Sequence, residues 1–295
     1  MQRGHWFSAV TIVVLVLVVA ALGWVSAETS RSGAQRPVST PTTVASKEPV
    51  ADDAKASGHP LDPILELANR SLQKLETEVD DYTALLTKRE RIDGRLGAET
   101  KMFVKIRTRR KEGDKLVRPL SVYLRFESPF LTRGREVIWV EDRNEGKLIG
   151  HEGASALIQV RLNPTDKLAM MGNKYPITEI GFTRLIEQLI EKGQRDRKVG
   201  SCRVTVEDGH KIGDRPCKLI QVVHPDRDPR FDFHIAEIFF DIETQIPLCY
   251  KAFTWSEKPD GPPVLEEEYT YTDVRLNVGL TDADFDPDNS AYHFK

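Results

Sequence analysis

Cysteine is scarce in this chain, and none occurs before Cys202. The others are Cys217 and Cys249. Without a cysteine near the N-terminus there is no acceptor for the N-terminal lipid of a bacterial lipoprotein, which excludes that form of membrane attachment. An odd number of cysteines also leaves at least one thiol outside any disulfide within the chain.

Charge is absent from residues 6–27, which follow Arg3 and precede Glu28. About 22 residues reach roughly 33 Å as a helix, enough to cross a bilayer core of about 30 Å. The segment ends in Val25-Ser26-Ala27, which resembles a signal-peptidase site. We therefore predict that residues 1–27 are either a cleaved signal peptide or a retained transmembrane anchor, and that everything after them is exported.

Aromatic residues and a sustained apolar period are both missing from residues 28–59, where Pro, Ser, Thr, Ala and charges of both signs dominate. Such a segment cannot bury enough surface to offset its conformational entropy, so we predict a disordered tether. Residues 60–295 then form one domain. We expect this domain in the periplasm, either free or anchored to the inner membrane, and in both cases outside the cytoplasm.

Neither sign of charge dominates, because 42 Lys and Arg residues face 45 Asp and Glu residues, and nucleic acid is excluded as a partner. The acid-rich loop that holds His224 and His234 matches no standard metal-site spacing, and its prolines indicate a solvated turn. Calcium-loop, P-loop, dinucleotide and nucleophile-elbow motifs are also missing. We therefore predict a protein that is not an enzyme and uses no metal or cofactor.

Two helices and a series of strands are predicted from apolar periodicity. Asp62-Pro63 begins a helix whose apolar residues recur every three or four positions up to Val79, and a second helix covers about 178–192, with Gly193 as its stop. Alternating patterns predict the strands at 82–91, 101–109, 120–126, 136–141, 147–151, 156–162, 202–206, 217–224, 234–242, 248–255 and 265–276. The fold class is α+β, a strongly curved antiparallel sheet or half-open β-barrel wrapped around one or two helices, with a closed barrel or a sandwich as alternatives.

A disulfide is one interpretation of the first two cysteines. Cys202 and Cys217 lie on the runs 201–206 and 217–223, and a hairpin turning at Gly209-His210 places them opposite each other. The alternative is that all three thiols are small buried apolar groups. Cys249 is predicted to lie in the core.

Several stretches resemble the lipoprotein-carrier superfamily, the periplasmic LolA/LolB-like proteins. They are DYTA at 81–84, PLSVYLRF at 119–126, REVIWV at 135–140, EYTYTDVRLN at 268–277 and LTDADF at 280–285. A closer resemblance, to an uncharacterised bacterial exported family of domain-of-unknown-function status, rests on LAMMGNKYPITE at 168–179 and on the ending 282–289. The superfamily resemblance implies a LolA-like half-barrel whose apolar cavity holds acyl chains without performing chemistry, and no single binding residue carries over.

Aromatic residues on the predicted strands are candidates for the wall of such a cavity, with plain core residues as the alternative. They are Tyr123, Phe126, Trp139, Trp255, Tyr269 and Tyr271. The acidic run 266–268 is interpreted as a solvated sheet edge, the alternative being a patch for a cationic partner.

Two functions are compatible with these features. The first is a non-enzymatic cell-envelope protein that binds an apolar ligand, a lipid or a lipoprotein acyl chain, in a concave sheet. The second is a membrane-tethered sensor or interaction module that docks another envelope protein, with the inner membrane as a further partner if the N-terminal helix is retained.

Overall fold

The computed structural model describes residues 58–153, 159–258 and 261–294. The predicted signal or anchor (1–27) and nearly all of the predicted tether (28–59) lie outside these residues. The elements are α1 (Asp62–Glu78), β1 (Asp81–Ile92), β2 (Arg95–Leu96), β3 (Thr100–Arg107), β4 (Arg110–Glu112), β5 (Lys115–Arg118), β6 (Ser121–Ser128), η1 (Phe130–Thr132), β7 (Glu136–Val140), η2 (Asn144–Gly146), β8 (Leu148–His151), β9 (Gln159–Leu162), η3 (Ile177–Glu179), α2 (Phe182–Val199), β10 (Arg203–Ile212), β11 (Arg215–Val223), β12 (Ile235–Asp241), β13 (Pro247–Thr254), β14 (Val264–Leu276) and η4 (Asp282–Phe285).

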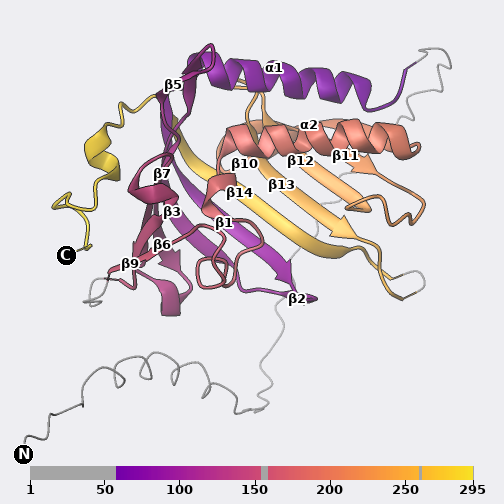
Figure 1. Cartoon of the computed structure of the whole chain (residues 1–295). Coiled ribbons are helices and arrows are strands. Elements are labelled where there is room, and N and C mark those ends of the chain that lie inside the picture. Colours follow the sequence, from indigo (N-terminus) through magenta and orange to yellow (C-terminus); the bar gives the residue numbers. More distant parts are fainter. Residues whose placement is uncertain (1–57, 154–158, 259–260, 295) are drawn as a thin grey trace, which may run out of the picture. The chain divides into compact units, whose positions relative to one another are not determined.

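One antiparallel sheet dominates the described residues. Its strands lie in the order β10-β11-β12-β13-β14-β1-β3-β6-β7-β8-β9, β2 adds to β1, and β4 pairs only with β5. The two ends of this order do not pair with each other, so the sheet stays open. In Figure 1, β3, β6 and β7 are seen nearly edge-on while β12 to β14 are seen face-on, which shows how strongly the sheet curves. The predicted α+β fold with a curved, open antiparallel sheet is confirmed.

Both helices lie on the same side of the sheet, where α2 runs across β11 to β14 (Figure 1). Leu75 of α1 and Phe182 and Ile186 of α2 are almost fully buried, each at most 1% exposed. They share one core cluster with residues of β1, β3, β6 and β14 such as Val104 and Tyr271. The alternating residues of these strands supply the apolar face that the helices cover.

Part of the opposite face of the sheet, over β6, β7 and β8, is covered by the C-terminal segment, residues 278–294. Phe285 and Phe294 are 3% and 6% exposed and form a third apolar cluster with residues of β6, β7 and β8. The ring of Tyr292 stacks on that of Tyr123, with their centroids 4.3 Å apart. The segment therefore closes a face of the sheet that would otherwise expose apolar side chains to water.

Helix α2 begins and ends later than the sequence predicts. Its first residue, Phe182, follows Gly181, whose φ of 106° suits glycine. The helix then continues through Gly193 to Val199. A Cβ built on Gly193 would lie only 2.9 Å from Cδ2 of Leu65. Gly193 therefore serves the close approach of α2 to α1 and is not a stop signal.

The predicted disulfide between Cys202 and Cys217 is absent, because all three cysteines are free and buried. The hairpin turns after Ile212, not at Gly209, and its register places His210 opposite Cys217. Gly209 instead has a φ of 87° at a register shift in β10, where an extra residue is accommodated. Cys202 comes directly before β10, at the end of this hairpin away from its turn, whereas Cys217 lies close to the turn. The Cα atoms of the two cysteines are therefore much farther apart than the roughly 7 Å that a disulfide tolerates.

Candidate functional site

An apolar cavity lies between the two helices and the strands β11 and β12. It measures about 50 Å³ and is lined by Leu61, Ile64, Leu65, Ala68, Leu189, Lys192, Gly193, Asp196, Val222, Phe233, Ala236, Ile238 and Phe240. Lys192 and Asp196 are its only charged lining residues. Small-molecule sites commonly measure about 300–1,000 Å³, so the cavity is nearly closed in this conformation.

The N-terminal half of α1 forms the roof of this cavity. Asp62 Oδ1 forms an ion pair with Arg197 Nε of α2 at 2.8 Å, and the side chain of Arg197 is about half exposed. The C-terminal end of α1 is held by more buried contacts, since Thr108 Oγ1 donates to the carbonyl oxygen of Val79 at 2.8 Å. The end of α1 that covers the cavity is thus held by apolar packing of residues such as Leu61 and Leu65 and by an ion pair of a kind that contributes only about 0–1 kcal/mol.

A buried polar cluster borders the cavity on the concave face. Glu267 of β14 is 2% exposed, accepts a hydrogen bond from Tyr175 Oη at 3.0 Å, and pairs with Lys174 at 3.0 Å and with Lys192 at 3.6 Å. Burial, together with the nearby Glu267 carboxylate, raises the pKa of the Tyr175 hydroxyl well above its usual range. The phenol therefore stays protonated and acts as a donor at neutral pH.

The second carboxylate of this cluster is Glu90 of β1. It pairs with Lys88 at 2.7 Å, accepts a hydrogen bond from Tyr269 Oη at 2.6 Å, and accepts another from the backbone N–H of Lys174 at 3.1 Å. Lys88 also donates to the Asn173 side chain at 2.7 Å. The segment 173–175 is thereby tied to the sheet through buried, charged hydrogen bonds.

The acidic run 266–268 is not a sheet edge. Strand β14 lies inside the sheet between β13 and β1, and each glutamate of the run has a basic partner: Glu266 pairs with Arg91 at 3.4 Å and Glu268 with Lys251 at 3.0 Å. The alternation of side chains along β14 turns Glu267 inward and its neighbours outward. A run of three like charges does not reveal which of them lies opposite a lysine from another element.

A buried His–Asp pair lies at the other side of the cavity. His224 Nε2 and Asp196 Oδ2 are 3.2 Å apart, and the imidazole stacks on Phe231 at 3.8 Å between centroids. Burial, together with the Asp196 charge, raises the pKa of the Cys202 thiol to about 11. This cysteine is therefore not an activated nucleophile at neutral pH.

The six aromatic residues proposed from sequence are spread over different parts of the fold, and none lines the apolar cavity. Trp139 and Tyr271 are buried in the core cluster beneath the helices, where Phe126 and Tyr269 pack against them. Tyr123 lies on the opposite face, under the C-terminal segment. Aliphatic residues of the helices and of β11 and β12 line the cavity instead, together with Phe233 and Phe240, and sequence periodicity marks such residues as core without showing a void.

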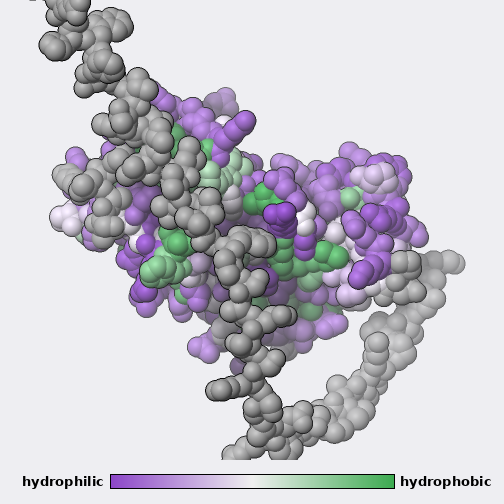
Figure 2. Space-filling view, turned by 90° about the horizontal axis from the view of Figure 1, so that it is seen from below, coloured by the Kyte–Doolittle hydropathy of each residue, from purple (hydrophilic) through white to green (hydrophobic). Residues whose placement is uncertain are grey.

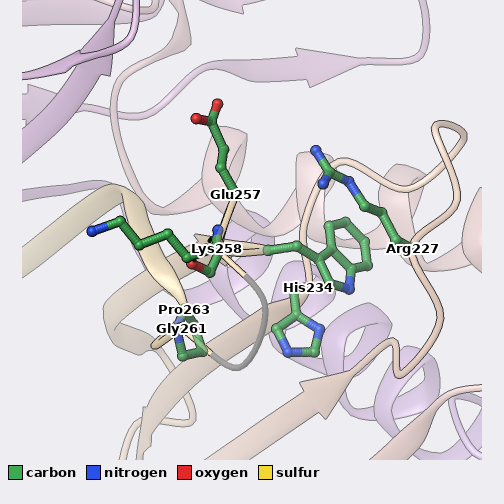
Figure 3. Close-up of a pocket in the computed structure, with 8 residues that line it drawn as sticks. Arg227, His234, Glu257, Lys258, Gly261 and Pro263 are labelled. Carbon is green, nitrogen blue, oxygen red and sulfur yellow. Dashed lines mark hydrogen bonds between the residues drawn. The ribbon is translucent and has the colours of Figure 1, made fainter.

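Trp255 lines a separate, larger and more open pocket of about 410 Å³, together with Arg227, His234, Ser256, Glu257, Lys258, Gly261 and Pro263. His234 Nδ1 lies 2.8 Å from the carbonyl oxygen of His224, so this nitrogen carries a proton and donates. Figure 3 shows that the side chains of Glu257 and Lys258 extend away from His234 in different directions. The polar residues of this pocket therefore do not converge on a common point.

Metal and membrane sites were sought among the same residues. Across residues 58–153, 159–258 and 261–294, no three His, Cys, Asp or Glu side chains gather closely enough to hold a metal ion. In the same ranges no helix has both the length and the apolar character needed to cross a membrane.

Comparisons with known proteins support the fold. A family model described as "Protein of unknown function (DUF1571)" matches residues 79–294. The chain matches no curated protein.

Three solved structures illustrate the likeness. A putative outer membrane lipoprotein-sorting protein domain from Vibrio parahaemolyticus is 14% identical, with 75% of this chain and 95% of that chain covered and a TM-score of 0.36. A LolA superfamily protein from Nitrosomonas europaea is 12% identical (74% and 97% covered, TM-score 0.29). MucB in the MucA/MucB complex of Pseudomonas aeruginosa is 13% identical (76% and 60% covered, TM-score 0.42). The resemblance to a family of domain-of-unknown-function status, predicted from the sequence, is confirmed by the family model over residues 79–294.

Proposed function

The chain belongs to the DUF1571 family of proteins of unknown function, and for this member we propose binding of an apolar ligand between its helices and the strands β11 and β12. The ligand is a lipid or the acyl chain of a lipoprotein, and the protein is an exported cell-envelope protein that performs no chemistry on it. The observation that carries the proposal is the cavity between the helices and the sheet, whose lining is apolar except for Lys192 and Asp196. Export is inferred from the uncharged residues 6–27.

Ligand entry requires the cavity to expand. At about 50 Å³ it holds a few water molecules, so an acyl chain enters only when the N-terminal half of α1 moves away from α2. The weak Asp62–Arg197 fastening permits that movement, while the buried bonds at Val79 and Thr108 keep the other end of α1 in place. We infer that α1 is the part of the protein that opens.

The test is native mass spectrometry of the full chain purified from its own envelope, followed by titration with a fluorescent fatty acid. Ala236→Val adds two carbon atoms that narrow the cavity and is expected to weaken binding at least about ten-fold, because a difference of even one methylene in an apolar pocket changes discrimination by about 10–200-fold. Ala84→Val is the matched control, since Ala84 is 1% exposed and Ala236 is 2% exposed, but Ala84 does not line the cavity. Equal binding by the two variants, or no acyl ligand on the wild type, contradicts the proposal.

A second function, docking of another envelope protein, is favoured by one surface feature. Phe130 and Leu131 lie in η1 between β6 and β7, and they are 86% and 85% exposed. Neighbouring apolar side chains that are exposed to solvent favour a protein contact site at this turn. Hydrophobic residues lie in separate patches among hydrophilic ones on the face seen in Figure 2.

Replacing both residues, Phe130→Ser with Leu131→Ser, is expected to remove a partner captured by cross-linking in the native envelope. Stability should change by no more than about 0.5 kcal/mol, as for most surface substitutions. The control pair is Leu168→Ser with Met171→Ser, which are also exposed, at 57% and 70%. If cross-linked products are the same in both double variants, η1 is not the docking site.

A further inference from the structure

Lys192 is the charged residue of the cavity wall that lacks a close partner. Its nearest carboxylate atom is Glu267 Oε1 at 3.6 Å, which is beyond hydrogen-bonding distance. Glu267 is already engaged by Tyr175 Oη and by Lys174, each at 3.0 Å. The ammonium group of Lys192 therefore lies at an apolar cavity with hydrogen-bonding capacity left over.

Tyr250 supplies a second polar group beside Lys192. This residue of β13 is 3% exposed, and its hydroxyl has no hydrogen-bond partner among the described residues. The Lys192 ammonium lies 5.8 Å from the centroid of the Tyr250 ring. A buried hydroxyl without a partner is unusual in a native protein, and a missing ligand is one physical reason for it.

The other charged lining residue, Asp196, lies one helical turn after Lys192. Its Oδ2 lies 3.2 Å from His224 Nε2 and its Oδ1 lies 3.5 Å from Arg195 Nε. Glu267 is held by Lys174 at 3.0 Å and Glu90 by Lys88 at 2.7 Å. The ammonium group of Lys192 is therefore the donor at the cavity that remains available to a ligand.

We propose that the apolar ligand carries a carboxylate head, as a single-chain fatty acid does, and that Lys192 and Tyr250 bind this head. The ammonium group donates a charge-assisted hydrogen bond to a carboxylate oxygen, and the Tyr250 hydroxyl donates a second. The acyl chain lies among the apolar residues of α1, α2, β11 and β12 that line the cavity. This assignment rests on the proposed function, since it requires that an acyl chain enters the cavity.

The experiment titrates the full chain, kept soluble in amphipol, with three probes of equal chain length: dodecanoic acid, 1-dodecanol and dodecylamine. The acid is expected to bind at least about ten-fold more tightly than the alcohol, because hydrogen bonds to charged groups are stronger than those between neutral groups. Lys192→Met removes the charge but keeps a long side chain, and it should reduce the affinity for the acid to that for the alcohol. Lys198→Met, an exposed lysine on the same helix, is the matched control and should leave the preference unchanged.

The outcomes separate the two proposals. If neither the acid nor the alcohol binds the wild-type chain, the proposed function is wrong. If both bind equally, if the amine binds most tightly, or if Lys192→Met keeps the preference for the acid, acyl binding stands and the assignment of the head group is wrong. Tyr250→Phe, which keeps the ring, provides an independent variant should Lys192→Met fail to fold, and it should lower the affinity for the acid but not for the alcohol.

Discussion

A disulfide that joins α1 to α2 is expected to block ligand uptake. The variant carries Leu65→Cys and Gly193→Cys, at the point where a Cβ on Gly193 lies 3.6 Å from Cγ of Leu65. The Cβ of Leu65 is bonded to that Cγ and lies more than 4 Å from the Cβ on Gly193, so the disulfide forms at or above the upper end of the usual Cβ separation of about 3.5–4.5 Å. Because the cavity measures about 50 Å³ with the helices closed, an acyl chain has no room until α1 moves. Binding of a fluorescent fatty acid should therefore fall at least about ten-fold in the oxidised form. Two methylenes of the acyl chain that are no longer buried already account for such a fall, at about 0.8 kcal/mol each.

Reduction supplies the control for this variant. The native cysteines are buried and free, so a mild reductant should open only the engineered bond and restore uptake in the same sample. The single variants Leu65→Cys and Gly193→Cys show what each substitution does to the packing by itself. Undiminished uptake by the oxidised double variant would mean that the chain binds elsewhere or that α1 is not the moving part.

Loss of Glu136 is expected to cause the largest fall in stability of any single carboxylate. Its side chain is 2% exposed and accepts hydrogen bonds from Tyr123 Oη at 2.5 Å and from the backbone N–H of His293 at 2.7 Å. His151 Nε2 lies 2.7 Å from the same carboxylate, and His151 Nδ1 faces the carbonyl oxygen of Gly153 at 2.9 Å. Since both partners of the imidazole are acceptors, the geometry fits a buried ion pair.

Removing one partner of a buried pair costs about 3–5 kcal/mol, which for a domain of this size is roughly 6–20 °C in Tm. Glu136→Ala should show this fall in a thermal denaturation experiment at pH 7. Glu152→Ala removes an ion pair with Arg135 whose carboxylate is 63% exposed, and it should cost no more than about 1 kcal/mol. A similar, small fall in both variants would show that Glu136 is not part of a stabilising pair.

The pH dependence follows from the direction of the pKa shift. Burial raises the pKa of Glu136, but hydrogen bonds from Tyr123, the His293 N–H and His151 outweigh it and lower the pKa below its ordinary value of 4.5. A lowered pKa in the folded state means that the stabilisation is present above pH 4.5 and is lost as the pH falls through the folded value. The stability difference between wild type and Glu136→Gln should therefore be present above pH 4.5 and shrink as the pH falls below it.

Glu136 of β7 also joins the sheet to the C-terminal segment that covers part of its opposite face. Its partner His293 belongs to the C-terminal segment, and that segment is held further by Lys105, which pairs with Asp284 at 2.7 Å. Loss of the carboxylate should therefore loosen residues near Phe294 first, because that end of the chain has few contacts beyond the buried cluster. Hydrogen exchange of the backbone amides reports this directly.

Local patterns determined much of this fold. The helix from Asp62 and the alternation along β1, β3 and β14 follow from the positions of apolar residues, since burial of one helix stripe or one strand face depends only on spacing along the chain. The curved, open antiparallel sheet with helices on one side was likewise predictable, because strands of that length and number have few ways to bury one face. Family membership could also be anticipated from short stretches of sequence.

Only the tertiary structure decided the site. Gly193 matches a helix stop in sequence but lies against Leu65, Cys217 lies opposite His210, and the buried Glu267 pairs with Lys174 from the segment before η3 and with Lys192 of α2. In each case the outcome depends on a partner distant in sequence, and neither strand register nor the approach of two helices is encoded in the spacing of one segment. The cavity at Ala68 and Ala236 has the same origin: a void is a property of facing surfaces, so the residues that line it look like ordinary core until both surfaces are in place.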